Sequence, residues 1–319
     1  MSFSRIIGYE RNVSLLRRAL ATGKLSHAYL FYGIDGSGMK EAALALVEAV
    51  FCNGTDGCGE CPSCRKVAGL RHPDLHHVQP DGAFIKIDQI RELQKELSYR
   101  PFEAPKKACI IEQADKMNTS AANAFLKTLE EPSGDAILIL MTTHVDAVLP
   151  TILSRCQQLR FPSLSTETIA SQLREKGADE DSARIAAALA GGSIERAQEI
   201  VEGDWLQTRR SLLERITALS PEEIIPLFAA AEEAAKDKDS AIHLVDLLNV
   251  FWRDILLTQS GSSEIVNTDL SPLIRSVAER NSLDRVIEKL ERIARTRQAL
   301  TRNANPRLAI EVLIMSLAD

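Results

Sequence analysis

The chain has 319 residues, of which 45% are hydrophobic and 26% charged, and its formal net charge is −6. This length allows two or three domains with cores of their own, and the negative charge argues against a nucleic-acid binder whose whole surface is basic. No apolar run approaches the length of a membrane span and residues 1–5 open no signal peptide, so we expect a cytoplasmic protein.

The first part of the chain predicts a helix, a strand, a glycine loop and a second helix. An amphipathic helix is expected to end near Gly23, and the apolar residues 28–32 predict a buried strand. Residues 33–41 are rich in glycine, and residues 42–47 predict a helix. A strand, a glycine loop and a helix form the context of a phosphate-binding P-loop, G-x-x-x-x-G-K-[ST].

The glycine loop departs from this pattern at its two chemically important positions. Gly33 and Gly38 fit, but Met39 stands where lysine is needed and Lys40 where serine or threonine is needed. Met39 cannot bring a positive charge to the β- and γ-phosphates, and Lys40 has no hydroxyl for Mg²⁺. Backbone N–H groups of such a loop could still favour an anion. Taken alone, the stretch fits either a degenerate P-loop or an ordinary glycine-rich turn.

A cluster of cysteines follows within residues 52–64. Its members are Cys52, Cys58, Cys61 and Cys64. In a cytosolic chain such clustering favours a metal ion over disulfides. Four thiolates suit tetrahedral Zn²⁺ and leave no open coordination position, so we expect a structural zinc site. The histidines at positions 72, 76 and 77 are not needed as ligands, and we interpret them as surface or packing residues.

The middle of the chain predicts further strands and helices and a second nucleotide motif. Residues 84–87 predict a short strand, and Asp88 is expected to cap the next helix. The apolar strand that begins at residue 107 runs into Glu112 and Gln113, where a Walker B motif has Asp and Glu. Glutamine is neutral and cannot serve as a general base. This second defect is independent of the first.

The next segments complete an alternation of helices and strands. Thr119 or Ser120 is expected to cap a helix that reaches Pro132, and strands are predicted at 137–141 and 158–161. From residue 163 onward the pattern is helical, with a break at 191–193. One apolar stripe, which we interpret as bundle core, comprises Leu244, Leu247, Leu248, Phe251 and Ile255.

The order of these motifs resembles the bacterial replicative clamp loader, a family of AAA+ proteins. The matching segments are 27–31 (HAYLF), the glycine loop, the four cysteines, 87–91 (IDQIR), 123–132 (NAFLKTLEEP) and 154–156 (SRC). Together they cover residues 5 to about 200, and 305–308 (NPRL) adds weaker support. The 123–132 run and the SRC triplet are specific as a pair, whereas the glycine loop alone would not be.

Within the family, the resemblance implies a subunit that does not hydrolyse ATP. The motor subunits, gamma and tau, carry an intact G-K-[ST] and an Asp-Glu pair, whereas this chain is similar to the family's subunit with degraded motifs. The motors' sensor-2 arginine lies two residues after a Gly-Ser, where this chain has Glu195. A shift of one residue in the alignment would place Arg196 there instead. We therefore expect this chain to bind no ATP.

The resemblance assigns the functional role to Arg155. In the family's ring, Ser-Arg-Cys presents an arginine to the ATP of a neighbouring motor subunit, and such a finger accelerates phosphoryl transfer by about 10³–10⁵. Taken alone, Arg155 would be a solvated surface arginine. The implied partners are gamma/tau and delta subunits in a hetero-oligomeric ring, and through that complex the sliding clamp and primed DNA. The chain would then be a component of the replicative polymerase holoenzyme.

We therefore predict three domains. Residues 1–162 are expected to form an α/β AAA+ P-loop core with an inserted zinc knuckle, 163–205 a small helical lid, and 206–319 an all-α helical collar. Two alternatives stay open. The chain could be an active ATPase motor subunit in which Lys40 replaces the missing lysine, although one helical position turns a side chain by about 100°. It could also be a module that binds ATP without hydrolysing it.

Overall fold

The computed structural model describes residues 3, 6–52, 56–131, 135–203, 205–218, 237–262, 264–302 and 304–318. The chain forms two compact units. The first comprises Met1–Leu164 with Gly192–Glu195, and the second comprises Ser165–Gly191 with Arg196–Asp319. The first unit therefore includes a short segment that returns to it after residue 164.

A parallel five-stranded sheet forms the centre of the first unit, in the order β2-β3-β4-β1-β5. The strands are β1 (Ala28–Gly33), β2 (Leu75–Val78), β3 (Lys107–Ile111), β4 (Ala136–Thr142) and β5 (Gln157–Phe161). Strands β3 and β4 are buried at every residue, because helices cover both faces of the sheet. This is the AAA+ arrangement expected from the sequence.

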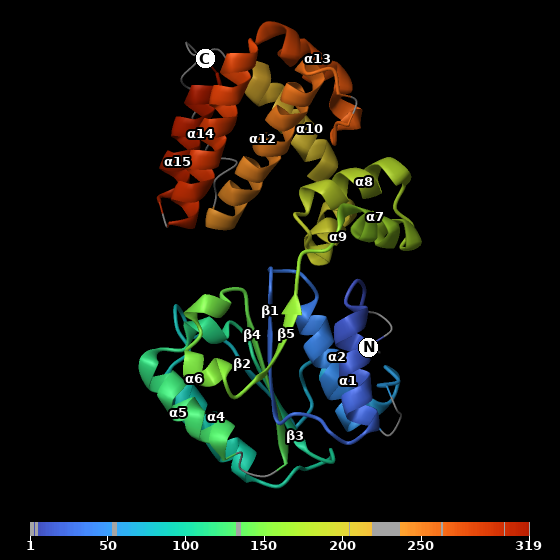
Figure 1. The fold of residues 1–319 in the computed structure, drawn as a ribbon, viewed down its shortest axis with the longest axis vertical. Coiled ribbons are helices and arrows are strands. Elements are labelled where there is room, and N and C mark those ends of the chain that lie inside the picture. The colour runs from blue at the N-terminus through green and yellow to red at the C-terminus, as the bar shows by residue number, and fades with distance from the viewer. Residues whose placement is uncertain are drawn as a thin grey trace. The chain divides into compact units, whose positions relative to one another are not determined.

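Helices pack on the two faces of the sheet in separate groups (Figure 1). One face carries α1 (Glu10–Ala21) and α2 (Met39–Phe51), and the other carries α4 (Ile87–Ser98), α5 (Thr119–Glu130) and α6 (Pro150–Leu153). Helix α2 is apolar nearly all round and is buried from Ala42 to Phe51. It follows the glycine loop directly, so the loop is held between a buried strand and a buried helix.

One predicted strand is wrong, and a different segment joins the sheet. Residues 84–87 form only isolated bridges, at Phe84 and Ile85, whereas Leu75–Val78 forms strand β2. Strand β2 lies at the sheet edge and pairs only with β3, so it does not need the continuous apolar run of a central strand. Helix α4 begins at Ile87, one residue before the predicted cap Asp88, and the Gln89 side chain accepts a hydrogen bond from the backbone N–H of Lys86 at 2.9 Å.

The second unit is helical. It comprises α7 (Thr166–Glu175), α8 (Glu180–Leu189), most of α9 (Ile194–Glu202), α10 (Trp205–Ala218), α12 (Lys238–Gln259), α13 (Ser271–Arg280), α14 (Leu283–Thr301) and α15 (Pro306–Leu317). The apolar stripe predicted on α12 is buried at all five positions. The predicted division of these helices into a lid and a collar at residue 205 stays a prediction.

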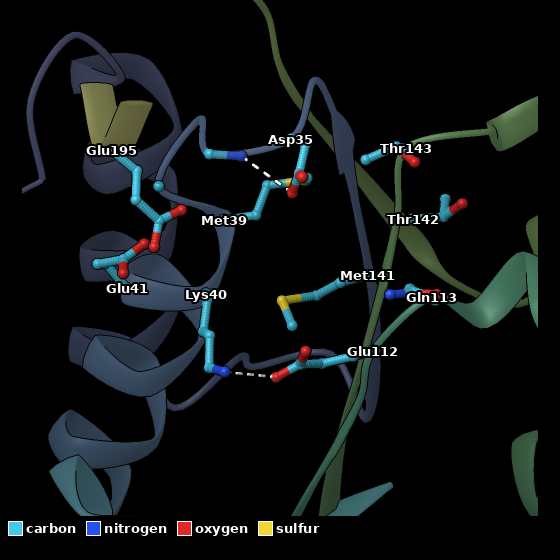
Figure 2. A pocket seen from close by; sticks show the side chains of 12 residues that line it. Asp35, Met39, Lys40, Glu41, Glu112, Gln113, Met141, Thr142, Thr143 and Glu195 are labelled. Atoms are coloured by element: carbon cyan, nitrogen blue, oxygen red, sulfur yellow. Dashed lines mark hydrogen bonds and ion pairs between the residues drawn. The ribbon is translucent and has the colours of Figure 1, made fainter. Parts of the chain in front are cut away.

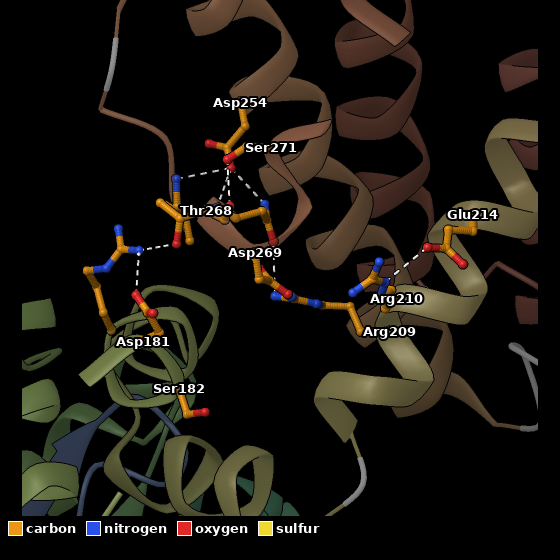
Figure 3. Close-up of polar contacts among 12 residues, drawn as sticks. Asp181, Ser182, Arg209, Arg210, Glu214, Asp254, Thr268, Asp269 and Ser271 are labelled. Carbon is orange, nitrogen blue, oxygen red and sulfur yellow. Dashed lines mark hydrogen bonds and ion pairs between the residues drawn. The ribbon is translucent and has the colours of Figure 1, made fainter. Parts of the chain in front are cut away.

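Charged side chains of three helices, two of them buried, hold the 264–271 segment in this unit (Figure 3). Arg184 of α8 bonds Thr268, and the fully buried Arg209 of α10 bonds Asn267 at 3.0 Å and pairs with Asp269. Asp254 of α12 accepts the backbone N–H of Asn267 at 2.7 Å. Because a buried charge is costly unless it is paired, these bonds specify one position for the segment.

Among the helices that the structure describes, none has both the length and the apolar character needed to cross a bilayer.

Candidate functional site

The glycine loop adopts a conformation that requires glycine. Gly36 and Gly38 have φ values of +64° and +88°, in the left-handed region that other residues rarely adopt. A Cβ on Gly33 would lie 1.9 Å from the carbonyl oxygen of Phe161 in the neighbouring strand β5. Gly38 is the N-cap of α2, so the loop ends where the helix begins. This geometry is that of a P-loop, not that of an arbitrary turn.

The charged side chains that line the pocket beside the loop are mostly acidic (Figure 2). Its charged side chains are Asp35, Lys40, Glu41, Glu112 and Glu195. Four carboxylates and one ammonium give the lining a net formal charge of −3. A nucleoside triphosphate is strongly anionic, so a negative formal charge on the lining is unfavourable for such a ligand.

Lys40 points to the Walker B position and not to the loop. Its Nζ lies 2.9 Å from Oε1 of Glu112, the first residue after β3. The same oxygen lies 2.7 Å from Nε2 of His77, near the end of β2. Strands β2 and β3 pair in parallel with His77 opposite Ile110, so His77 and Glu112 lie on the same face of the sheet. The sequence predicted His77 only as a surface or packing residue and gave no sign of this contact.

The pKa of Glu112 is lowered from its ordinary value of 4.5 to about 2. The hydrogen bond from His77 is the largest cause, partial burial opposes it, and Lys40 adds to the lowering. A carboxylate with a lowered pKa stabilises the fold fully above its unfolded pKa and loses that stabilisation as the pH falls toward its folded pKa. The window for Glu112 therefore runs from about pH 4.5 down to about pH 2.

We expect Glu112→Gln to make the stability of the protein less sensitive to acid. At pH 7 the variant should lose on the order of 1–3 kcal/mol of unfolding free energy, because the charged partner of Lys40 and His77 is gone. The difference from the wild type should shrink as the pH falls from 5 to 3. Urea unfolding of both proteins across this range measures it. A difference that stays constant with pH would show that the carboxylate charge contributes nothing.

Other residues near the pocket are constrained by backbone conformation or by hydrogen bonds within the chain. Gln113 has a φ of +50°, a left-handed conformation that is uncommon outside glycine. At the end of β4, the hydroxyl of Thr142 donates to Asp115 Oδ1 at 2.6 Å and accepts the backbone N–H of His144 at 3.0 Å. Thr142 is buried at 2% exposure, so its hydroxyl belongs to this turn. Thr143 lines the pocket but is exposed.

A later segment of the chain closes over the loop. The hydroxyl of Ser193 donates to the carbonyl oxygen of Gly36 at 3.0 Å, and the backbone N–H of Glu195 donates to the same oxygen at 3.3 Å. Glu195 lines the pocket (Figure 2), whereas Arg196 lies 3.4 Å from Asp246 of the second unit. Of the two residues that the resemblance offers for the sensor-2 position, Glu195 is thus the one that lines the pocket.

Arg155 lies outside this pocket, after the short helix α6. Its Nη1 donates to the carbonyl oxygen of Thr151 at 2.9 Å, and its Nη2 lies 2.6 Å from Oε1 of Glu130 at the end of α5. About a third of the Arg155 side chain and half of the Glu130 side chain are exposed. Such a surface ion pair contributes at most about 1 kcal/mol. Its guanidinium is therefore available to a stronger anionic partner.

The four predicted cysteines come together at one point. Their Sγ atoms all lie within 4.8 Å of one another, with 4.0 Å between Cys58 and Cys64 and 3.9 Å between Cys52 and Cys61. A tetrahedron of sulfurs about 2.3 Å from a zinc ion has edges of about 3.8 Å. The donor set and its spacing thus fit one Zn²⁺, and these cysteines could hold it. The 153–158 stretch and β3 place Cys156 and Cys109 elsewhere.

Backbone N–H groups orient the sulfurs, as the short spacings predict. The N–H of Cys61 donates to Cys58 Sγ at 3.3 Å, and the N–H of Cys64 donates to Cys61 Sγ at 3.4 Å, where α3 (Pro62–Ala68) begins. Bonds from the backbone N–H groups of Glu60 and Cys61 lower the pKa of Cys58 to about 6. A thiolate is the form that binds metal, so the backbone prepares this sulfur for it.

Comparisons with known proteins find sequence matches that cover most of both units. The family described as DNA polymerase III, delta subunit, matches residues 8–165, and its C-terminal counterpart matches residues 203–319. The DNA polymerase III subunit delta' of Bacillus subtilis is 32% identical over 97% of this chain and 96% of its own length. The subunit tau of the same organism is 26% identical over 99% of this chain and 61% of its own length.

A solved structure shows the same fold. The DNA polymerase III gamma subunit-related protein of Thermotoga maritima matches 96% of this chain and 98% of its own, with a TM-score of 0.51 and 20% identity. That likeness concerns the fold alone, while the sequence likeness extends along nearly the whole chain. This chain belongs to the delta' subunits of DNA polymerase III.

Proposed function

We propose that this delta' clamp-loader subunit hydrolyses no ATP itself and supplies Arg155 to ATP held by a neighbouring gamma/tau subunit. The observation that carries the proposal is the contrast between the two candidate sites. The chain's own pocket is acidic and its only lining lysine among the described residues is paired with Glu112. Arg155, by contrast, is about one-third exposed and held by a weak surface ion pair.

Three features support the absence of ATP hydrolysis. Met39 stands at the position of the phosphate-binding lysine and is buried at 8% exposure. Gln113, at the position of the general base, cannot accept a proton from water. Glu195 brings a negative charge to the place of the sensor arginine. Each removes a group that phosphoryl transfer requires, and none compensates for another.

The chemistry of guanidinium supports the role of Arg155. Arginine is always charged and can fork onto two phosphate oxygens, which stabilises the charge that develops on the transferred phosphoryl group. Its present partner Glu130 is half exposed, so exchanging that carboxylate for a phosphate costs little. The bond from Nη1 to the carbonyl oxygen of Thr151 would hold one side of the guanidinium while Nη2 engages the neighbour.

We further propose that the chain works in a hetero-oligomeric ring with gamma/tau and delta subunits, and through that complex acts on the sliding clamp and primed DNA. Helix α15 supports an assembly role for residues 206–319. Its residues Leu308, Val312 and Met315 follow helical spacing and are 47–60% exposed. An exposed apolar stripe of this kind is typical of a helix that packs against a partner. Zn²⁺ held by the four cysteines would be structural.

The two alternatives predict different behaviour of the isolated chain. An active ATPase would hydrolyse ATP and lose that activity on Lys40→Ala, whereas a non-hydrolysing ATP-binding module would bind labelled ATP without turnover. We expect neither binding nor hydrolysis. Saturable binding of Mg·ATP to the isolated wild-type chain would contradict the proposal that this pocket binds no ATP.

Reconstitution tests the function as a whole. The clamp loader is assembled with and without this chain, and clamp loading onto primed DNA is measured together with DNA-stimulated ATP hydrolysis. We expect both activities to require the chain although the chain alone has none. Full activity of a complex that lacks it would overturn the proposal.

A further inference from the structure

The contact between Lys40 and Glu112 lies where a working P-loop site holds its metal ion. In such a site Mg²⁺ is bound by the Ser or Thr that follows the P-loop lysine and by the Walker B acid. Here those two positions are occupied by Lys40 and Glu112. Their side chains meet directly, with 2.9 Å between Nζ and Oε1. The space between the two metal-binding positions therefore contains an ammonium group.

We propose that the Lys40 ammonium takes the place of the divalent cation and is the residue that excludes Mg-nucleotide from this pocket. This inference rests on the proposed function, in which the pocket binds no ATP, and it gives the reason why ATP does not bind. The substitutions at Met39, Gln113 and Glu195 weaken nucleotide binding. Lys40, in contrast, occupies the position at which P-loop enzymes bind the metal ion that contacts the β- and γ-phosphates.

The charges around Glu112 are matched without a metal. Oε1 of Glu112 lies within 3 Å of both Lys40 Nζ and His77 Nε2, and Gln79 Nε2 lies 3.2 Å from the same nitrogen of His77. The side chain of Glu112 is only 20% exposed. A largely buried carboxylate that already has two partners gains little from a divalent cation. A metal ion would also have to displace the ammonium group and would be repelled by it.

The position of Lys40 on the helix explains why the lysine serves this purpose and not phosphate binding. Lys40 is the second residue of α2, one position after the P-loop lysine site at Met39. One residue turns a helical side chain by about 100°, and here that turn directs Nζ toward the end of β3. Moving a lysine by one position therefore changes it from a phosphate ligand into an internal cation.

The test compares variants that differ only in what stands at position 40. Met39→Lys restores the phosphate lysine and keeps Lys40. Met39→Lys/Lys40→Thr restores G-K-T completely, and Met39→Lys/Lys40→Arg keeps a positive charge at position 40. Binding of a fluorescent ATP analogue to each isolated, zinc-loaded chain is measured with Mg²⁺ and with EDTA, and circular dichroism and urea unfolding establish that each variant is folded.

We expect the Lys40→Thr double variant to bind Mg·ATP at least about tenfold more tightly than the other two, with EDTA removing the gain. Equal binding by Met39→Lys alone would overturn the inference, and so would a folded Lys40→Thr double variant that binds no better than the wild type. Tight Mg·ATP binding by the wild-type chain would instead overturn the proposed silence of the pocket. Failure of this inference can thus be distinguished from failure of the proposed function.

Discussion

Arg155→Ala is expected to leave the clamp loader assembled but to slow hydrolysis of the ATP that faces this subunit by about 10³–10⁵. The variant removes the only positive charge that the 153–156 segment offers to a neighbour. Its fold should be intact, because the lost contacts are a partly exposed ion pair and hydrogen bonds to the Thr151 carbonyl and the Ser154 hydroxyl. Single-turnover hydrolysis by the reconstituted complex, with clamp and primed DNA present, measures the effect.

Two variants sharpen this result. Arg155→Lys keeps the charge without the fork, so it should recover only part of the rate. Arg174→Ala is the matched control, because Arg174 is also about one-third exposed and pairs with surface carboxylates, Glu167 at 2.8 Å and Glu180 at 2.6 Å. It should leave the rate unchanged. If Arg155→Ala and Arg174→Ala behave alike, Arg155 is an ordinary surface arginine and the finger assignment is wrong.

Cys61→Ser is expected to reduce bound zinc from one ion per chain to none. Structural zinc sites contribute folding free energy directly, about 10–16 kcal/mol of binding in isolated zinc-finger peptides. Here the module is attached to a folded core, so we expect a loss on the order of a few kcal/mol and unfolding confined mainly to residues 56–69. Cys61 also caps α3 by accepting the N–H of Cys64, so the helix should fray.

The effect should reach one further segment. Lys66 of α3 pairs with Glu103 at 2.6 Å, and Asp74 accepts the backbone N–H groups of Phe102, Glu103 and Ala104. Hydrogen exchange should therefore increase in α3 and near residue 103, but not in β4. Cys156→Ser, the same chemical change outside the cluster, should retain zinc. Metal-free protein of unchanged stability would contradict a structural zinc site.

The residues at the motif positions beside the glycine loop could be predicted because they stand at known spacings in the sequence. Met39, Lys40, Glu112 and Gln113 are each read directly from a motif, and so is the set of four cysteines. The role of His77 could not be predicted in this way. It depends on the parallel register of β2 and β3, and the sequence pattern predicted a strand at 84–87 but none at Leu75–Val78.

The sequence by itself determined the order of strand, glycine loop and helix, the cysteine cluster and the central strands, because apolar periodicity and ligand spacing are local properties. Only the tertiary structure decided where Lys40 points and which residue after Ser193 faces the loop. Those outcomes depend on contacts between distant segments, Lys40 with Glu112 and Ser193 with Gly36. The interaction energy of a charged side chain with a partner depends on charge and distance. The fold determines which partners lie close enough to interact.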